Sequence, residues 1–244
     1  RGARLTALLF RDDAYAKSCT TTVTAINDRG GIILDQTVFY ATAGGQPGDK
    51  GTLSLKDRGI AIATAVYDDA KNVVHVPAEG QQLPSVGDQV TVTLDWVNRH
   101  RIMRAHTMMH LLCAAVPFAV TGSSLTDDGG RIDFDIPEGQ IPDRTELATR
   151  INGWISEDHP VTTRWITDEE LDANPELVRT MFVKPPRGTG KVRLVLIGSD
   201  GKIDLQPCGG THVKSTGEIG PVAVDKIQNK GKINRRIRLV LKDI

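Results

Sequence analysis

The sequence predicts an α+β protein in which a small, all-β N-terminal domain precedes an α+β domain. Three observations support this prediction. Residues 88–96 alternate apolar and polar side chains with a period of two, as a half-buried strand does. Residues 99–120 contain no glycine and repeat apolar side chains at helical spacing. Residues 191–241 return to strand-like segments. We place the domain boundary between residues 95 and 96.

The N-terminal domain, residues 1–95, is expected to consist of short strands separated by Gly, Asp and Pro. Such a pattern is typical of a small barrel or a sandwich, and we expect a small β-barrel. The expected strands are residues 19–26, 30–40, 61–68, 72–77 and 88–96.

The second domain, residues 96–244, is expected to begin with a long helix. The side chains that share one face of this helix are Ile102, His106, Met109, His110, Cys113 and Val116. Asp143 and Glu146, then Thr167 and Glu170, have the spacing of capping boxes at the starts of two further helices. The remaining expected elements are strands at 130–136, 161–167, 191–198, 202–206, 222–228 and 235–241, a loop at 184–190 and a hairpin turn at 229–232. These strands favour an antiparallel sheet.

Composition restricts the class of protein. No run of 18 apolar residues occurs, so we expect no membrane-spanning segment. Three cysteines, Cys19, Cys113 and Cys208, do not form a disulfide framework and favour a reducing, cytoplasmic environment. No protein partner can be inferred from the composition.

The formal net charge of zero conceals an asymmetry. Residues 214–244 contain eight Lys or Arg against three acids, which leaves +5 there and −5 in the rest of the chain. This basic segment is either a solvated hairpin face or a surface that contacts the phosphates of a nucleic acid.

Two pairs of residues have the spacing of metal ligands. His106 and His110 stand at i and i+4 on the expected helix, so both side chains can reach one ion. Cys208 and His212 flank Gly209 and Gly210, which allow a sharp turn between them. The combination favours zinc over two unrelated core histidines. Three ligands would leave a catalytic position open and four would close a structural site; the pattern does not decide between them.

Two motifs carry a resemblance to a known family. Residues 105–112 (AHTMMHLL) and 206–220 (QPCGGTHVKSTGEIG) closely resemble the metal-site motifs of the editing domain of alanyl-tRNA synthetases and of their free-standing relatives, the AlaX proteins. Residues 35–51 resemble the glycine-rich block before that domain, and 130–135 its central strand. The likeness runs from about residue 30 to the C-terminus, and we expect a medium-length, free-standing AlaX protein.

The resemblance implies an α+β editing domain, a zinc cofactor and a set of functional residues. The implied zinc ligands are His106, His110, Cys208 and His212. The implied substrate contacts are Thr121, where the synthetases often have Gln, and Gly44, Gly45 and Gln46 of the glycine-rich block, which can also be a simple tight turn. The side chains expected to hold tRNA phosphates are Arg99, Arg101, Arg104, Lys230, Lys232, Arg235 and Arg236.

The implied activity is hydrolysis of the ester in mischarged tRNA(Ala), with seryl-tRNA(Ala) favoured and glycyl-tRNA(Ala) as the second substrate. Zinc could polarise the carbonyl or activate a bound water; alternatively, it could hold the substrate amino group while the tRNA activates water. The sequence indicates no carboxylate as a general base. Two alternatives stay open: a zinc-stapled RNA-binding module without hydrolytic activity, and a deacylase for another mischarged tRNA such as threonyl-tRNA.

Overall fold

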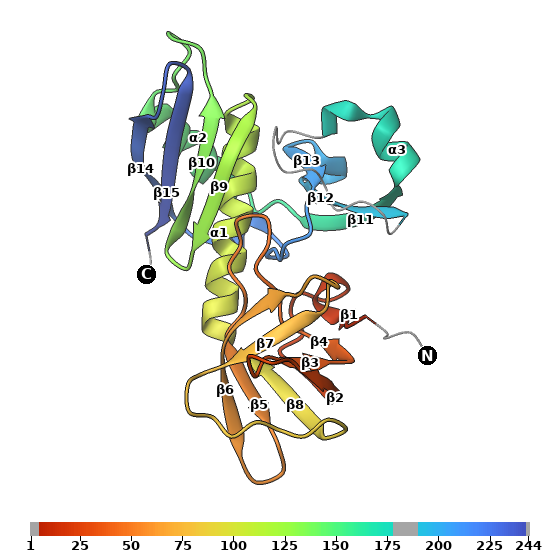
Figure 1. Cartoon of the computed structure of the whole chain (residues 1–244). Coiled ribbons are helices and arrows are strands. Elements are labelled where there is room, and N and C mark those ends of the chain that lie inside the picture. Colours follow the sequence, from red (N-terminus) through yellow and green to blue (C-terminus); the bar gives the residue numbers. More distant parts are fainter. Residues whose placement is uncertain (1–4, 178–189, 243–244) are drawn as a thin grey trace. The chain divides into compact units, whose positions relative to one another are not determined.

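A computed structural model describes residues 5–177 and 190–242 (Figure 1). The chain divides into two compact units, Arg1–His100 and Arg101–Ile244. The expected boundary at 95/96 coincides with the start of a long helix, whereas the units divide one turn inside it.

The first unit is a closed, six-stranded antiparallel barrel, as predicted (Figure 1). Its strands, in order around the barrel, are β2 (Ser18–Ile26), β3 (Ile32–Leu34), β7 (Val73–Pro77), β6 (Gly59–Tyr67), β5 (Gly51–Ser54) and β8 (Gln89–Leu94). The period-two pattern of β8 is confirmed, because Val90, Val92 and Leu94 are buried while the residues between them are exposed. Closure leaves no unpaired strand edge, and it distinguishes this unit from a sandwich.

The strand expected over residues 30–40 is interrupted. It forms β3 and then the two-residue strand β4 (Gln36–Thr37), which pairs in parallel with β1 (Ala7–Leu8). The short 3-10 helix η1 (Leu9–Arg11) follows β1 in the chain. The bend falls at Asp35, whose carboxylate accepts a hydrogen bond from the Thr21 hydroxyl (2.6 Å) and another from the Thr22 backbone N–H (2.9 Å). The side chain thus competes for backbone donors and ends the strand.

The second unit contains a four-stranded antiparallel sheet and two helices that lie behind it in Figure 1. The strand order is β14 (Val222–Asn229), β15 (Asn234–Leu241), β10 (Gly129–Asp135) and β9 (Val120–Thr126). The helices are α1 (Trp96–Ala115) and α2 (Arg144–Ser156). A Cβ atom added at Gly130 would lie 3.0 Å from the Met109 sulfur, so α1 approaches β10 closely at this glycine. Asp143 is the N-cap of α2 and accepts from the backbone N–H groups of Thr145 and Glu146, but no return bond from the Glu146 side chain completes the expected capping box.

A three-stranded antiparallel sheet completes the second unit. Its strand order is β11 (Val161–Thr167), β12 (Lys191–Ile197) and β13 (Asp204–Pro207). In the sequence, α3 (Asp168–Ala173) lies between β11 and β12. The capping box of Thr167 and Glu170 at the start of α3 is confirmed. Short 3-10 helices are η2 (Pro175–Leu177), η3 (Ser199–Gly201) and η4 (Thr216–Ile219). The loop expected over 184–190 lies outside the described residues except for Gly190.

Strand β9 has no counterpart in the sequence prediction. Its segment, VTGSSLT, has Gly-Ser-Ser at its centre, which interrupts the alternation of apolar and polar residues, and glycine disfavours strands. The pairing with β10 supplies the order that local propensity does not. Across the residues that the structure describes, no helix is long and apolar enough to cross a bilayer, and no disulfide joins the three cysteines.

Candidate metal centre

The second unit brings together the four residues with ligand spacing. His106 and His110 project from α1 with their ring centroids 5.3 Å apart. Cys208 follows the end of β13, and His212 follows the Gly209–Gly210 turn. One donor atom from each of the four lies within 4.8 Å of the other three. Residues about one hundred positions apart in the sequence therefore converge on a single point.

The donor set fits zinc, and the two distances from the Cys208 sulfur match tetrahedral spacing. Donor atoms of a tetrahedral zinc site with one sulfur and three nitrogens lie about 3.3–3.6 Å apart, given the usual bond lengths. The Cys208 sulfur lies 3.5 Å from Nε2 of His106 and 3.4 Å from Nε2 of His212. His110 and His212 are buried, whereas Cys208 keeps partial exposure. Three imidazoles and a thiol are also donors that hard ions such as magnesium do not favour.

The turn between Cys208 and His212 is held by a buried arginine. Arg193 of β12 donates from Nη1 to the carbonyl oxygens of Cys208 (3.1 Å) and Gly210 (2.9 Å). Its own carbonyl accepts from the Cys208 backbone N–H at 3.0 Å. The Gly210 N–H points at the Cys208 sulfur from 3.4 Å, a contact that favours the thiolate. Strand β12 therefore fixes the position of a ligand that the loop alone would leave mobile.

Two histidines also make contacts on the far side of their rings. Nδ1 of His110 lies 2.8 Å from Oδ2 of the buried Asp204, and Nδ1 of His212 lies 3.1 Å from the hydroxyl of the buried Thr107. The sequence did not indicate a role for Thr107, Asp204 or Arg193. Thr107 lies within the helical ligand motif, Asp204 lies four residues before Cys208, and Arg193 lies on the neighbouring strand β12. These positions can be read from the sequence, but the hydrogen bonds that the three side chains make with the ligand residues cannot.

The charges of these groups influence one another. Burial raises the pKa of the Cys208 thiol, but His106 and His212 outweigh it and hold that pKa well below its usual range. Burial lowers the pKa of His212, and His106 and His110 lower it further. Burial opposes a charged His110, yet the hydrogen bond to Asp204 and the neighbouring Cys208 sulfur raise its pKa to about 10. The cluster therefore supplies the thiolate that a metal site requires.

The residues expected to contact the aminoacyl group lie in both units. Gly44 and Gly45 form a tight turn with φ values of +57° and +85°, a conformation that favours glycine at both positions. Gln46 follows the turn and is 1% exposed. Thr121 lies in β9, where its hydroxyl donates to the Asp133 carbonyl (3.2 Å) and accepts from the Asn234 amide (2.7 Å).

The expected phosphate contacts divide into buried and exposed side chains. Arg99 is 1% exposed and pairs with the buried Asp49, and Arg235 is 4% exposed and donates to the Gly231 and Asn234 carbonyls. Both guanidiniums are buried and paired within the protein, and their assignment to phosphate contacts stays a prediction. Lys230 and Lys232 are exposed in the turn between β14 and β15.

The other three arginines of that set are partly exposed. Arg236 makes a two-pronged ion pair with Asp133 (2.8 and 2.9 Å), and this pair holds the pKa of Asp133 below its usual range. Arg104 donates from Nε and Nη2 to the Ile219 carbonyl. Arg101 lies half-buried on α1.

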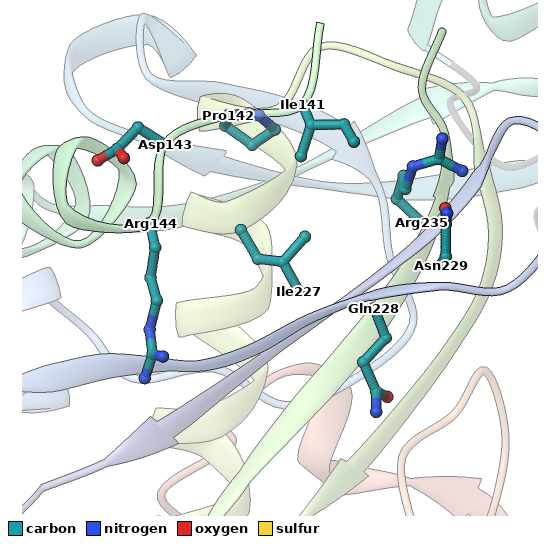
Figure 2. A pocket seen from close by; sticks show the side chains of 8 residues that line it. All are labelled: Ile141, Pro142, Asp143, Arg144, Ile227, Gln228, Asn229 and Arg235. Carbon is teal, nitrogen blue, oxygen red and sulfur yellow. The ribbon is translucent and has the colours of Figure 1, made fainter. Parts of the chain in front are cut away.

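An open groove of about 620 Å³ lies in the second unit, beside the basic hairpin. Figure 2 shows its lining side chains, which come from the segment before α2, from the first residue of α2, from β14 and from the start of β15. They are Ile141, Pro142, Asp143, Arg144, Ile227, Gln228, Asn229 and Arg235. None of them belongs to the His/Cys cluster, so the groove is a separate feature.

The fold and the cluster agree with comparisons to known proteins. Residues 192–238 match the family model for the threonyl and alanyl tRNA synthetase second additional domain, and residues 9–98 match the model for class II (A) tRNA synthetases. A relative from Methanosarcina acetivorans, named alanyl-tRNA editing protein AlaX-M, is 32% identical over 98% of this chain and 100% of its own length. The chain belongs to the AlaX-M family.

Two further relatives are a second AlaX-M protein and an alanine–tRNA ligase. The AlaX-M protein of Pyrococcus horikoshii is 30% identical over 97% of this chain and 98% of its own length. The alanine–tRNA ligase of Pyrobaculum neutrophilum is 35% identical over 90% of this chain, which corresponds to 25% of that ligase. The resemblance predicted from the two metal-site motifs is therefore confirmed over nearly the full chain.

Proposed function

We propose that this protein is a trans-editing deacylase that hydrolyses the ester of mischarged tRNA(Ala), with seryl-tRNA(Ala) as its principal substrate and glycyl-tRNA(Ala) as the second. Alanyl-tRNA editing proteins are deacylases, and membership of the AlaX-M family makes this chain an aminoacyl-ester hydrolase. The observation that supports the proposal most strongly is the convergence of His106, His110, Cys208 and His212. The three thiols outside disulfides favour the cytoplasm as the compartment.

These four side chains would hold a zinc ion. When bound, zinc supplies a Lewis acid that polarises an ester carbonyl and promotes attack by water. The chain itself contributes the thiolate of Cys208, the turn that Arg193 holds in place, and rings that are already oriented toward one point. Such preorganisation leaves little reorganisation to be done when the ester arrives.

Discrimination against alanine requires a partner for the serine hydroxyl. A site that binds a hydroxyl disfavours the analogue without it, by up to about 10⁴-fold, because the polar groups of the site would stay unpaired. We assign this contact to Thr121 or Gln46. The Thr121 hydroxyl donates one hydrogen bond and its oxygen accepts one, so one lone pair is left for a substrate hydroxyl. In the glycine-rich block, the positive φ angles of Gly44 and Gly45 account for the glycines as turn residues. The side-chain amide of Gln46, the next residue, is therefore the group of this block to test for contact with the substrate hydroxyl.

The tRNA contact is assigned to the exposed lysines of the β14–β15 turn, Lys230 and Lys232, together with the partly exposed Arg101, Arg104 and Arg236. Phosphate contacts of this kind position the nucleic acid without reading its sequence. The neighbouring groove adds the side-chain amides of Gln228 and Asn229, which can hydrogen-bond to sugars and bases.

One alternative has a specific observation in its favour. Four convergent protein donors are the pattern of closed, structural zinc sites. On that basis the cluster would staple an RNA-binding module that has no hydrolytic activity. A change of substrate within the same chemistry, to threonyl-tRNA, is the other alternative, because the matched family model covers threonyl as well as alanyl tRNA synthetases.

Deacylation of seryl-tRNA(Ala), measured beside alanyl-tRNA(Ala) and glycyl-tRNA(Ala), tests the proposal. We expect the wild type to release serine rapidly and alanine slowly, and Cys208→Ala to abolish the reaction. Cys19→Ala is the matched control, because it removes a thiol from the barrel and should leave the rate unchanged. A wild type that binds these tRNAs but cleaves none would support the closed binding module. Thr121→Val and Gln46→Leu, if both keep the serine preference, would remove those residues from the assignment.

A further inference from the structure

We infer that Thr107 and Asp204 are positioning residues, which set the zinc affinity of the cluster by fixing the orientation and tautomer of two ligand histidines. The inference rests on the proposed zinc site. It concerns hydrogen bonds on the side of each ring that faces away from the point of convergence. In proteins such contacts hold a ligating imidazole in place and leave its other nitrogen for the metal.

Asp204 acts on His110. Its carboxylate oxygen Oδ2 lies 2.8 Å from Nδ1 of His110, and both residues are buried. Because an ionised carboxylate only accepts hydrogen bonds, Nδ1 carries a proton, so Nε2 is the nitrogen that gives up its proton and binds a metal. The Gln206 amide donates to the same Oδ2 at 2.8 Å, so the carboxylate is itself held from a second direction.

Thr107 acts on His212. Its hydroxyl donates its single proton to the Met103 carbonyl (3.0 Å), one turn earlier on α1. The oxygen accepts from the Val213 backbone N–H (3.3 Å) and lies 3.1 Å from Nδ1 of His212. Since the hydroxyl proton is already used, Nδ1 of His212 is the donor in this contact. Nε2 is thereby left unprotonated, and it is the atom that lies 3.4 Å from the Cys208 sulfur.

These two contacts have the same consequence for separate ligands. Each places the proton on Nδ1 and directs Nε2 toward the cluster. Thr107 also lies between His106 and His110 in the sequence, so a single helical turn supplies two ligands and the group that orients a third. Loss of either contact would let a ring rotate or take the other tautomer, and would weaken the hold on the metal without removing a donor.

Zinc affinity, measured by competition with a chromophoric chelator on the full chain, tests this inference without reference to catalysis. Thr107→Val keeps the shape of the side chain and removes its oxygen, and Asp204→Leu removes the acceptor. We expect each to lower zinc affinity about 10- to 100-fold. Thr107→Ser should restore wild-type affinity, and Asp204→Asn, which keeps an acceptor oxygen, should fall between the two extremes. The visible spectrum of the cobalt-substituted protein should change in Thr107→Val and Asp204→Leu and not in Thr107→Ser.

Thr216→Val is the matched control. Thr216 is also buried, donates to a carbonyl (Trp154, 2.7 Å) and accepts from a backbone N–H (His159, 2.8 Å). Its substitution should lower stability to a similar extent and leave zinc affinity unchanged. If Thr107→Val does not fold, the zinc affinities of Asp204→Asn and Asp204→Leu are compared instead, and equal affinities in these two variants and the wild type would contradict the inference.

Two outcomes would overturn the inference: variants that bind zinc as tightly as the wild type with an unchanged cobalt spectrum, or a wild type that has no tight zinc site. A wild type that binds zinc tightly and does not deacylate seryl-tRNA(Ala) would overturn the proposed function and leave this inference standing.

Discussion

Arg193 and Gly210 are joined by a buried hydrogen bond of 2.9 Å, from the guanidinium to the backbone carbonyl. The same nitrogen also bonds to the Cys208 carbonyl. The arginine therefore closes the glycine turn that separates Cys208 from His212. Glycines give this turn its sharpness, but they also make it flexible, and the side chain from β12 removes that freedom.

Replacement of Arg193 should therefore weaken the metal centre. We expect Arg193→Met to cost about 1.5–3 kcal/mol in unfolding free energy, the range for a buried hydrogen bond to a charged group. Zinc affinity should fall as well, because the turn carries two of the four ligands. Thermal unfolding with and without added zinc measures both effects. Equal stabilisation by zinc in the variant and the wild type would contradict the role given to this arginine.

The barrel should lose stability in acid because of His75. Its Nδ1 donates to the Ile32 carbonyl (3.1 Å), and its Nε2 lies 2.8 Å from the Thr37 hydroxyl, which also accepts from the Phe39 backbone N–H. The hydroxyl therefore donates to a neutral ring. Burial lowers the pKa of His75 from 6.5 to about 4, despite the bond to Ile32.

The sign of the effect follows from that shift. The unfolded chain takes up a proton near pH 6.5 and the folded chain only near pH 4, so stability is complete above about pH 6.5. It falls as the pH drops toward 4, by at most ~3 kcal/mol. Urea unfolding of the wild type and of His75→Gln across this range checks the prediction. The same pH slope in both proteins would exclude His75 as the cause.

Removing one partner of the buried ion pair between Arg99 and Asp49 should strongly destabilise the first unit. Their side chains are 1% and 3% exposed, and Asp49 also accepts from the Tyr40 backbone N–H. Asp49→Ala leaves a buried guanidinium without its counter-charge, and we expect a loss of about 3–5 kcal/mol. Chemical denaturation measures it. Asp128→Ala, which breaks the half-exposed pair with Arg238, is the control and should cost less than about 1 kcal/mol. Similar losses in both variants would contradict the prediction.

The hairpin lysines should determine part of the salt dependence of tRNA binding. If Lys230 and Lys232 contact phosphates, replacing both by Gln should reduce the slope of log affinity against log salt by about two. Lys56 and Lys202 are also exposed and serve as a matched pair, whose replacement should leave the slope unchanged. Filter binding of tRNA at several salt concentrations distinguishes the cases. An unchanged slope for the hairpin variant would make these lysines ordinary solvated surface.

Local pattern was sufficient to predict much of the fold. The alternation in β8, the helix α1 and the capping box of α3 follow from periodicity and from side chains bonding to nearby backbone, and these three elements are confirmed. The helix ends before Val116, however, and it is buried on more than the one expected face. The bend at Asp35 and the strand β9 were not predicted. Each depends on a partner elsewhere in the chain, a threonine on β2 for the bend and the strand β10 for β9.

The sequence by itself determined the two pairs of metal-ligating residue types and the family to which they point, because spacing of i and i+4 along a helix or across a glycine turn is a local property. Only the tertiary structure decided that the two pairs meet, that Arg99 and Arg235 are buried and that Thr107, Asp204 and Arg193 support the ligands. Burial and hydrogen-bond partners are set by which distant strands and helices pack together, and a single sequence does not display that packing.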